Sequence, residues 1–183
     1  MSSEDGLAHV AWTRRYLDNS GFFQQTVSYT TIDSSCLMTP VQDIMEPILL
    51  SEGKYWGIGM DIDGPEILLA GYHHKLNTGS SNENTAVFMA MSESPTKSTD
   101  WIINPQVVGG LDVVSGGTDP VAVGIGEEDG HILYQDTRND TTGLDRLGLW
   151  YSHGLPEQTS WSYRKAVGDL SLIHISEPTR PMN

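Results

Sequence analysis

The sequence predicts an all-β protein built from about three four-stranded meanders. Two observations lead to this fold class. Gly and Pro are abundant, at 19 and 9 residues, and they stand between short apolar runs, which favours short strands joined by turns over long helices. In addition, one order of residues recurs along the chain, and self-similarity at a regular spacing is the signature of a repeat architecture. A β-sandwich made from the same short strands is the alternative.

The repeat consists of an Asp-Gly pair, an apolar run, a polar turn and a second apolar run that ends near a Ser. The three Asp-Gly pairs precede Ser28, Ser92 and Ser152 by 23, 29 and 23 positions. Nine positions after the Ser, the second and third units have Trp101 and Trp161, and the first has Leu37. The units therefore cover residues 5–50, 55–108 and 120–168.

Each unit contains runs with the length and composition of strands. In the first unit we expect strands at 8–13 and 25–30 and a less regular one around 41–50, with nothing before Asp5 to form an initial strand. In the second unit we expect strands at 55–60, 66–72, 86–91 and 101–108. In the third we expect them at 121–125, 131–135, 147–152 and 160–167.

Four short antiparallel strands in about 50 residues have the size and make-up of a propeller blade. The sequence thus predicts a β-propeller-like array of about three blades, an incomplete propeller, in one domain of residues 1–169. The tryptophans Trp56, Trp101 and Trp161 are expected to pack between blades. Because three blades do not close a ring, we expect open blade edges through which the chain forms a homo-oligomer or aggregates.

The last residues, 170–183, are expected not to belong to the domain. The string LSLIHISEPTR, Leu170–Arg180, resembles the read-through translation of a transposase adaptor used in preparing sequencing libraries. This resemblance implies an artefactual tail and a natural protein that continues differently after Asp169.

Charge and composition narrow the range of partners. The formal net charge is −14 with only 10 Lys and Arg, which disfavours nucleic acid and anionic membranes because phosphate contacts require basic side chains. The N-terminus lacks the apolar stretch of a signal peptide and no run has the length of a membrane span, so we expect a soluble protein of unknown compartment. With Cys36 as its one cysteine, the chain has no intrachain disulfide, and no cofactor or metal is expected.

The order of Asp-Gly, strand, loop, strand with Ser and closing Trp resembles the blades of sialidase-like (Asp-box) and fungal fucose-lectin propellers, over residues 5–168. The lectin resemblance implies sites between blades in which an Arg and an acidic residue hydrogen-bond a sugar and an aromatic ring stacks on its apolar face. Such a set suits a sugar, which offers hydroxyls on its edges and C–H groups on one face. The candidate ligand-binding residues are Trp12, Arg14, Tyr134, Asp136, Arg138 and Trp150.

The predicted function is non-catalytic, lectin-like binding of a glycan, fucose or a related sugar. One alternative is a glycoside-hydrolase or sialidase-like propeller, for which Asp61, Asp63, Glu127, Glu128 and Asp136 are available carboxylates without a spacing that selects a pair. A protein-interaction propeller is a third interpretation. The sequence does not decide which sugar is bound or whether the protein is an enzyme.

Overall fold

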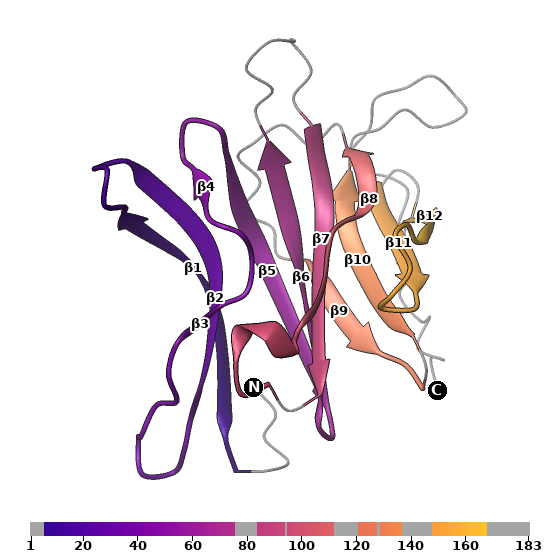
Figure 1. Ribbon diagram of the computed structural model, residues 1–183. Helices are drawn as coiled ribbons and strands as arrows, with labels where there is room; N and C mark the ends of the chain where they lie inside the picture. The colour runs from indigo at the N-terminus through magenta and orange to yellow at the C-terminus, as the bar shows by residue number, and fades with distance from the viewer. Residues whose placement is uncertain are drawn as a thin grey trace, which may run out of the picture.

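The computed structural model describes residues 6–75, 84–93, 95–111, 121–127, 129–136 and 148–167. These residues form three antiparallel sheets of four strands each, which stand side by side in chain order (Figure 1). Within these ranges there is no α-helix, only the 3-10 turn η1 (Ser98–Asp100), and no helix long or apolar enough to cross a membrane. The predicted all-β class is therefore confirmed. Arg138 and the tail 170–183 lie outside the described residues.

Sheet I consists of β1 (Ala8–Leu17), β2 (Phe23–Ile32), β3 (Gln42–Asp43) and β4 (Ile48–Leu49). The strands β3 and β4 both pair with β2, so the irregular strand expected around 41–50 is confirmed as two short pieces. Asp18 forms the β1–β2 turn, where its Oδ1 accepts hydrogen bonds from the backbone N–H groups of Ser20 and Phe22 at 2.8 and 2.9 Å. Gly21 supplies the positive φ, 80°, that this turn requires.

Sheets II and III are regular meanders in which each strand pairs with the next. Sheet II consists of β5 (Gly53–Asp63), β6 (Glu66–Lys75), β7 (Asn84–Glu93) and β8 (Ile102–Leu111). Sheet III consists of β9 (Ala122–Ile125), β10 (Gly130–Asp136), β11 (Gly148–Gly154) and β12 (Ser162–Val167). All eight strands lie where the apolar runs predicted them.

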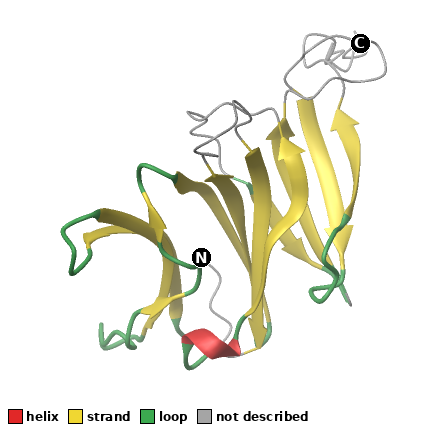
Figure 2. Ribbon diagram, turned by 45° about the horizontal axis from the view of Figure 1, so that its top comes forward, coloured by secondary structure: helices red, strands yellow, loops and turns green. Residues whose placement is uncertain are grey.

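The core lies in two layers, one on each face of sheet II. Because successive side chains of a strand point to opposite faces, β6 and β7 divide their apolar residues between the layers. Leu68 and Met89 face sheet III and pack with Ile132 and Tyr134. Leu69 and Phe88 face sheet I and pack with Val27 and Tyr29. Figure 2 shows the three sheets stacked face to face with sheet II in the middle.

The first strands of sheets II and III touch directly. The backbone N–H of Val121, just before β9, donates to the carbonyl of Gly57 at 2.8 Å, and the N–H of Ile125 donates to Oδ2 of Asp61 at 3.0 Å. Gly59 permits this approach, because a Cβ at that position would lie 1.9 Å from the carbonyl oxygen of Val121. Sheets II and III therefore approach each other closely at β5 and β9.

The repeated tryptophans connect each sheet to the one before it. The indole of Trp101 meets Tyr29 edge-on, with ring centroids 5.1 Å apart, and its Nε1 donates to Oε1 of Gln42 at 3.0 Å. Trp161 is buried in the layer between sheets II and III, where its backbone N–H donates to the carbonyl of Val107 at 2.9 Å. Their predicted role in packing between units is confirmed. Trp56 stacks on Tyr72 within sheet II and lies against the same layer as Trp161.

Candidate functional site

Three of the predicted ligand-binding residues lie in the core. Tyr134, Asp136 and Trp150 are only 1%, 0% and 8% exposed, and Tyr134 and Trp150 belong to the layer between sheets II and III. They are on the face of β10 and β11 that sheet II covers, so a sugar in solution does not reach them in this structure. The alternation of side chains along a strand predicts that it has two faces. It does not indicate which of the two faces a neighbouring sheet will cover.

The other two described candidates, Trp12 and Arg14, share the outer face of β1, which no described sheet covers. The Nη2 atom of Arg14 donates to Oδ2 of Asp43 at 2.6 Å, and its guanidinium lies over the ring of Tyr16, 5.1 Å from the centroid. The hydroxyl of Ser28 donates to the other carboxylate oxygen of Asp43 at 2.7 Å. An arginine, a carboxylate and aromatic rings therefore do meet here. Sequence reasoning missed Asp43, because its strand is only two residues long and has no apolar alternation.

The clefts between consecutive sheets form a second candidate site, at the end of the molecule that carries the β5–β6 turn and the β7–β8 loop. The first pocket lies between sheets I and II and has a volume of about 340 Å³. Sheet I contributes polar and aromatic groups, namely His9, Tyr29, Thr31, Thr39 and Gln42. Sheet II closes the pocket with Gly64 and Pro65 of the β5–β6 turn and with Pro95 and Thr96 of the β7–β8 loop.

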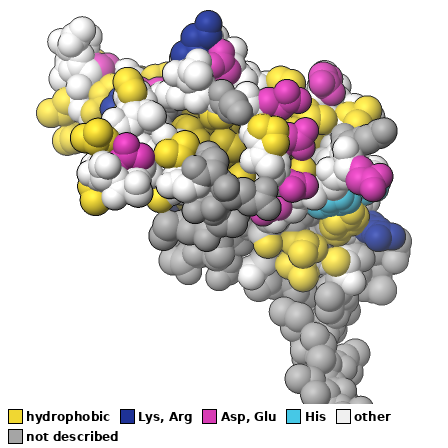
Figure 3. All heavy atoms as spheres, turned by 90° about the horizontal axis from the view of Figure 1, so that it is seen from below, with side chains coloured by type: hydrophobic (Ala, Val, Ile, Leu, Met, Phe, Trp, Pro, Cys, Tyr) yellow, Lys and Arg dark blue, Asp and Glu magenta, His cyan; other side chains and the backbone are white. Residues whose placement is uncertain are grey.

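The second pocket occupies the corresponding place between sheets II and III, with a volume of about 560 Å³. Here the β9–β10 turn contributes Gly126 and Glu127, and the β11–β12 loop contributes Leu155, Pro156 and Glu157. Its lining is rich in carboxylates, which are Glu66, Glu93, Asp100, Glu127 and Glu157. Viewed from this end, acidic side chains gather over the half of the molecule that holds sheets II and III (Figure 3).

The first two pockets occupy corresponding places, because each is closed by the first turn and the last loop of the following sheet. In each sheet a cross-strand pair lies at the pocket: His9 with Thr31 in sheet I, Glu66 with Glu93 in sheet II, and His131 with His153 in sheet III. Two residues before the second member of each pair stand Tyr29, Met91 and Tyr151, on the same face. The repeat therefore places one pocket on the same face of each sheet and changes only the side chains that line it.

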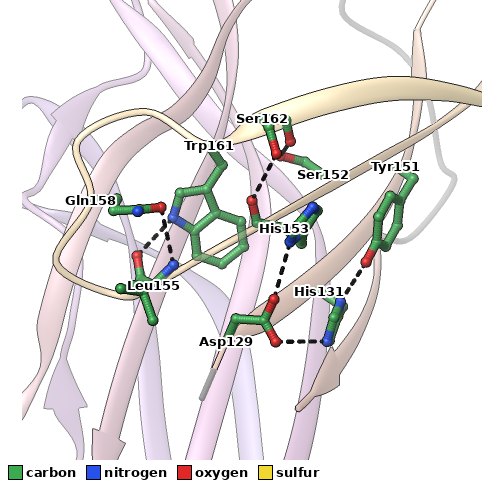
Figure 4. Close-up of polar contacts among 9 residues, drawn as sticks. All are labelled: Asp129, His131, Tyr151, Ser152, His153, Leu155, Gln158, Trp161 and Ser162. Carbon is green, nitrogen blue, oxygen red and sulfur yellow. Dashed lines mark hydrogen bonds and ion pairs between the residues drawn. The ribbon is translucent and has the colours of Figure 1, made fainter. Parts of the chain in front are cut away.

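On sheet III this position is open, because no described segment covers the outer face. A wide cavity of about 1010 Å³, the third pocket, is lined by Asp129, His153 and the β11–β12 loop. The carboxylate of Asp129 lies between two imidazoles, with Oδ1 3.1 Å from His131 Nε2 and Oδ2 3.1 Å from His153 Nδ1 (Figure 4). The other ring nitrogen of His131 contacts the hydroxyl of Tyr151 at 2.6 Å.

The loops that close the first two pockets are held by the residues of the repeat. The hydroxyls of Ser92 and Ser152 donate to the carbonyls of Asp100 and Ser162 at 2.7 and 2.8 Å, next to the two tryptophans. The carboxylate of Asp100 accepts hydrogen bonds from both the backbone and the side chain of Thr96, at 2.9 and 2.8 Å. Those bonds hold the pKa of Asp100 below its usual value. The recurring Ser-to-Trp spacing therefore reflects the closure of these loops rather than contact with a ligand.

No protein-family model matches the chain, and no curated protein matches it. Within the described ranges, no three His, Cys, Asp or Glu side chains are placed to hold a metal ion.

Proposed function

We propose that this protein binds carbohydrate without catalysing a reaction, through pockets between consecutive blades of a propeller-type array. The observation that carries the proposal is the recurrence of a pocket between corresponding elements, once between sheets I and II and again between sheets II and III. A binding site that a repeat generates in each unit is what a lectin with several equivalent sites needs.

The propeller arrangement is part of the proposal. Its support is that sheets II and III are four-stranded meanders and that the three sheets stack in chain order. Four-stranded sheets stacked face to face are the arrangement of neighbouring propeller blades.

We assign the neutral sugar, fucose or a related monosaccharide, to the first pocket. Its volume of about 340 Å³ is at the lower end of the range of small-molecule sites. Hydroxyl, amide and imidazole groups of sheet I offer hydrogen bonds, and the prolines Pro40, Pro65 and Pro95 offer apolar walls. The second pocket, with five carboxylates, is a poorer match for a neutral sugar because each carboxylate loses hydration when a ligand covers it.

A glycan array followed by calorimetric titration with the best monosaccharide tests the proposal. The change Thr31→Val removes one pocket hydroxyl at nearly constant volume, and we expect it to weaken binding by about fivefold, since a lost hydrogen bond to a ligand costs about 1 kcal/mol. The matched control is Arg14→Ala on the outer face of sheet I, which should bind as the parent protein does.

Three other outcomes would contradict the proposed site or the proposed function. Binding that is lost in Arg14→Ala and kept in Thr31→Val assigns the sugar to the Trp12, Arg14 and Asp43 face instead. A protein that retains no glycan on the array, yet is folded by circular dichroism, is not a lectin. Hydrolysis of chromogenic glycosides would favour the glycoside-hydrolase alternative.

A further inference from the structure

The loops that close the first two pockets are each bonded to the preceding sheet by a side-chain amide. At the first pocket, Gln42 on β3 of sheet I donates from Nε2 to the carbonyl of Pro95 at 3.3 Å. At the second pocket, Asn104 on β8 of sheet II donates from Nδ2 to the carbonyl of Gln158 at 2.7 Å. Pro95 belongs to the β7–β8 loop and Gln158 to the β11–β12 loop. One kind of contact therefore recurs at both interfaces.

The oxygen of each amide is bonded as well, and this bond fixes the orientation of the group. Oε1 of Gln42 accepts a hydrogen bond from Nε1 of Trp101 at 3.0 Å. Oδ1 of Asn104 accepts one from the backbone N–H of Gln106, also at 3.0 Å. An indole N–H and a backbone N–H are donors only, so each must face the amide oxygen. The amide nitrogen is then directed to the loop carbonyl. We call Gln42 and Asn104 the bridging amides.

Hydrogen bonds inside each loop fix its shape. In the β7–β8 loop, Oδ2 of Asp100 accepts a hydrogen bond from the backbone N–H of Thr96 at 2.9 Å. In the β11–β12 loop, the N–H of Leu155 donates to Oε1 of Gln158 at 3.2 Å, and the N–H of Gln158 donates to the carbonyl of Leu155 at 3.1 Å. Bonds within a loop do not set its position relative to the opposite sheet. The bridging amides hold that position ahead of the repeat tryptophan, which holds the end of the loop.

We propose that the bridging amides, Gln42 and Asn104, are positioning residues that hold one wall of the first and second pockets in place before a ligand arrives. Each loop supplies such a wall, with Pro95 in the first pocket and Leu155 in the second. A ligand that meets a wall already in position does not have to order it, which favours affinity. The positioning does not depend on what the pockets bind, whereas its effect on sugar binding rests on the proposed function.

Nuclear magnetic resonance relaxation of the backbone amides tests the positioning without a ligand. Gln42→Met and Asn104→Leu each replace an amide by an apolar side chain of similar size and introduce no charge. Gln42→Met should lower the order parameters of the loop at 96–100 from about 0.85 to below about 0.6 and leave those at 155–160 unchanged. Asn104→Leu should have the reverse effect. Each variant is the matched control for the other.

A second variant at the first pocket guards against misfolding, since Gln42→Met also removes the acceptor of the Trp101 indole. The carboxylate of Gln42→Glu still accepts that hydrogen bond but has no donor for the carbonyl of Pro95. It should therefore loosen the same loop as Gln42→Met does. Order parameters that keep their parent values in these variants overturn the proposal. So does a fall in both loops in one variant, because that result shows general loosening rather than the loss of one bridge.

Calorimetric titration with the best monosaccharide from the glycan array measures the consequence for the first pocket. Gln42→Met should weaken binding by about fivefold, as expected for the loss of one hydrogen bond, and the change should lie mainly in the dissociation rate. Parent-like binding by a variant whose loop has become mobile would contradict the link between positioning and affinity. If the parent protein binds no sugar, the proposed function fails, and the relaxation measurements still decide whether the amides position the loops.

Discussion

At the scale of single residues, Trp101 does most to fix sheet I against sheet II. Its ring is buried, meets Tyr29 edge-on and donates to Gln42. Leu37 stands at the same place in the repeat of the first unit but is largely exposed. The same position of the repeat therefore contributes very differently to stability, depending on whether a described sheet lies against it.

We expect Trp101→Ala to lower the free energy of unfolding by about 3–5 kcal/mol, because it removes a buried indole and leaves a cavity. Leu37→Ala is the control, and in dilute protein it should change stability by less than about 0.5 kcal/mol. Urea denaturation followed by fluorescence measures both. Equal effects of the two substitutions would contradict the packing described here.

Tyr55 links stability to pH. Its hydroxyl donates to the carbonyl of Glu46 at 3.0 Å, and its ring stacks on His73. Burial, with the Glu46 carboxylate as a smaller contribution, raises the pKa of Tyr55 from 10.0 to about 12. The folded protein therefore holds the phenol proton more tightly than the unfolded chain does.

The sign of the resulting pH dependence follows from linkage. The contribution of Tyr55 is fully present below pH 10 and is lost as the pH rises from 10 to 12, because the unfolded chain loses its proton first. Tyr55→Phe should lack this part of the decline, so the difference in unfolding free energy between the two proteins should shrink across that window. A constant difference from pH 9 to pH 12 would show that the phenol titrates normally.

At the scale of elements, the close approach of β5 and β9 depends on a glycine. A Cβ on Gly59 would lie 1.9 Å from the Val121 carbonyl oxygen, which is backbone and cannot move without displacing β9. At Gly124, in β9 itself, the nearest atom to an added Cβ is 4.0 Å away. The two glycines thus offer a matched pair of substitutions on facing strands.

Gly59→Ala should lower the free energy of unfolding by about 1–3 kcal/mol, since the strands must separate to relieve the overlap. Gly124→Ala should be close to neutral. Thermal unfolding of the two variants side by side measures the difference. If both behave alike, β9 does not pack against β5 as described.

At the scale of the whole molecule, the protection of backbone amides from hydrogen exchange should decrease from sheet II to sheets I and III. Sheet II has a core layer on each face, and Leu68, Leu69, Val87, Phe88 and Met89 are fully buried. Among the described residues, sheets I and III each have a hydrophobic core layer on one face only. The backbone hydrogen bonds of a strand that is packed on both faces break only when the whole protein unfolds. Those of a strand that is covered on one face also break through local opening.

Hydrogen exchange measured by mass spectrometry on dilute protein tests this. Peptides from β6 and β7 should exchange most slowly, and peptides from β1 and β12 earlier. Exchange of β12 as slow as that of β6 under these conditions would mean that the outer face of sheet III is covered within one chain.

Much of the fold was predictable because it depends on short-range patterns. Apolar runs of strand length between Asp-Gly turns placed all the strands of sheets II and III, and the Ser-to-Trp spacing predicted which tryptophans pack between sheets. The irregular β3 and β4 were only partly predicted, because strands of two residues have too few positions to show alternation. The propeller arrangement stays a prediction.

The site was less predictable. Alternation along β10 shows that Tyr134 and Asp136 share a face, but only the stacking order of the sheets makes that face a buried one. The same order leaves Trp12 and Arg14 half-buried on the other side of sheet I and brings Asp43 to the guanidinium from 29 residues away.

The sequence by itself determined the strands, the turns and the repeat, because backbone propensity and side-chain alternation act over a few residues. Only the tertiary structure decided which face of each strand is buried and which cross-strand pair lies at each pocket. Those outcomes depend on contacts between residues far apart in the chain, and a sheet has the same alternating pattern whichever of its faces receives the next one.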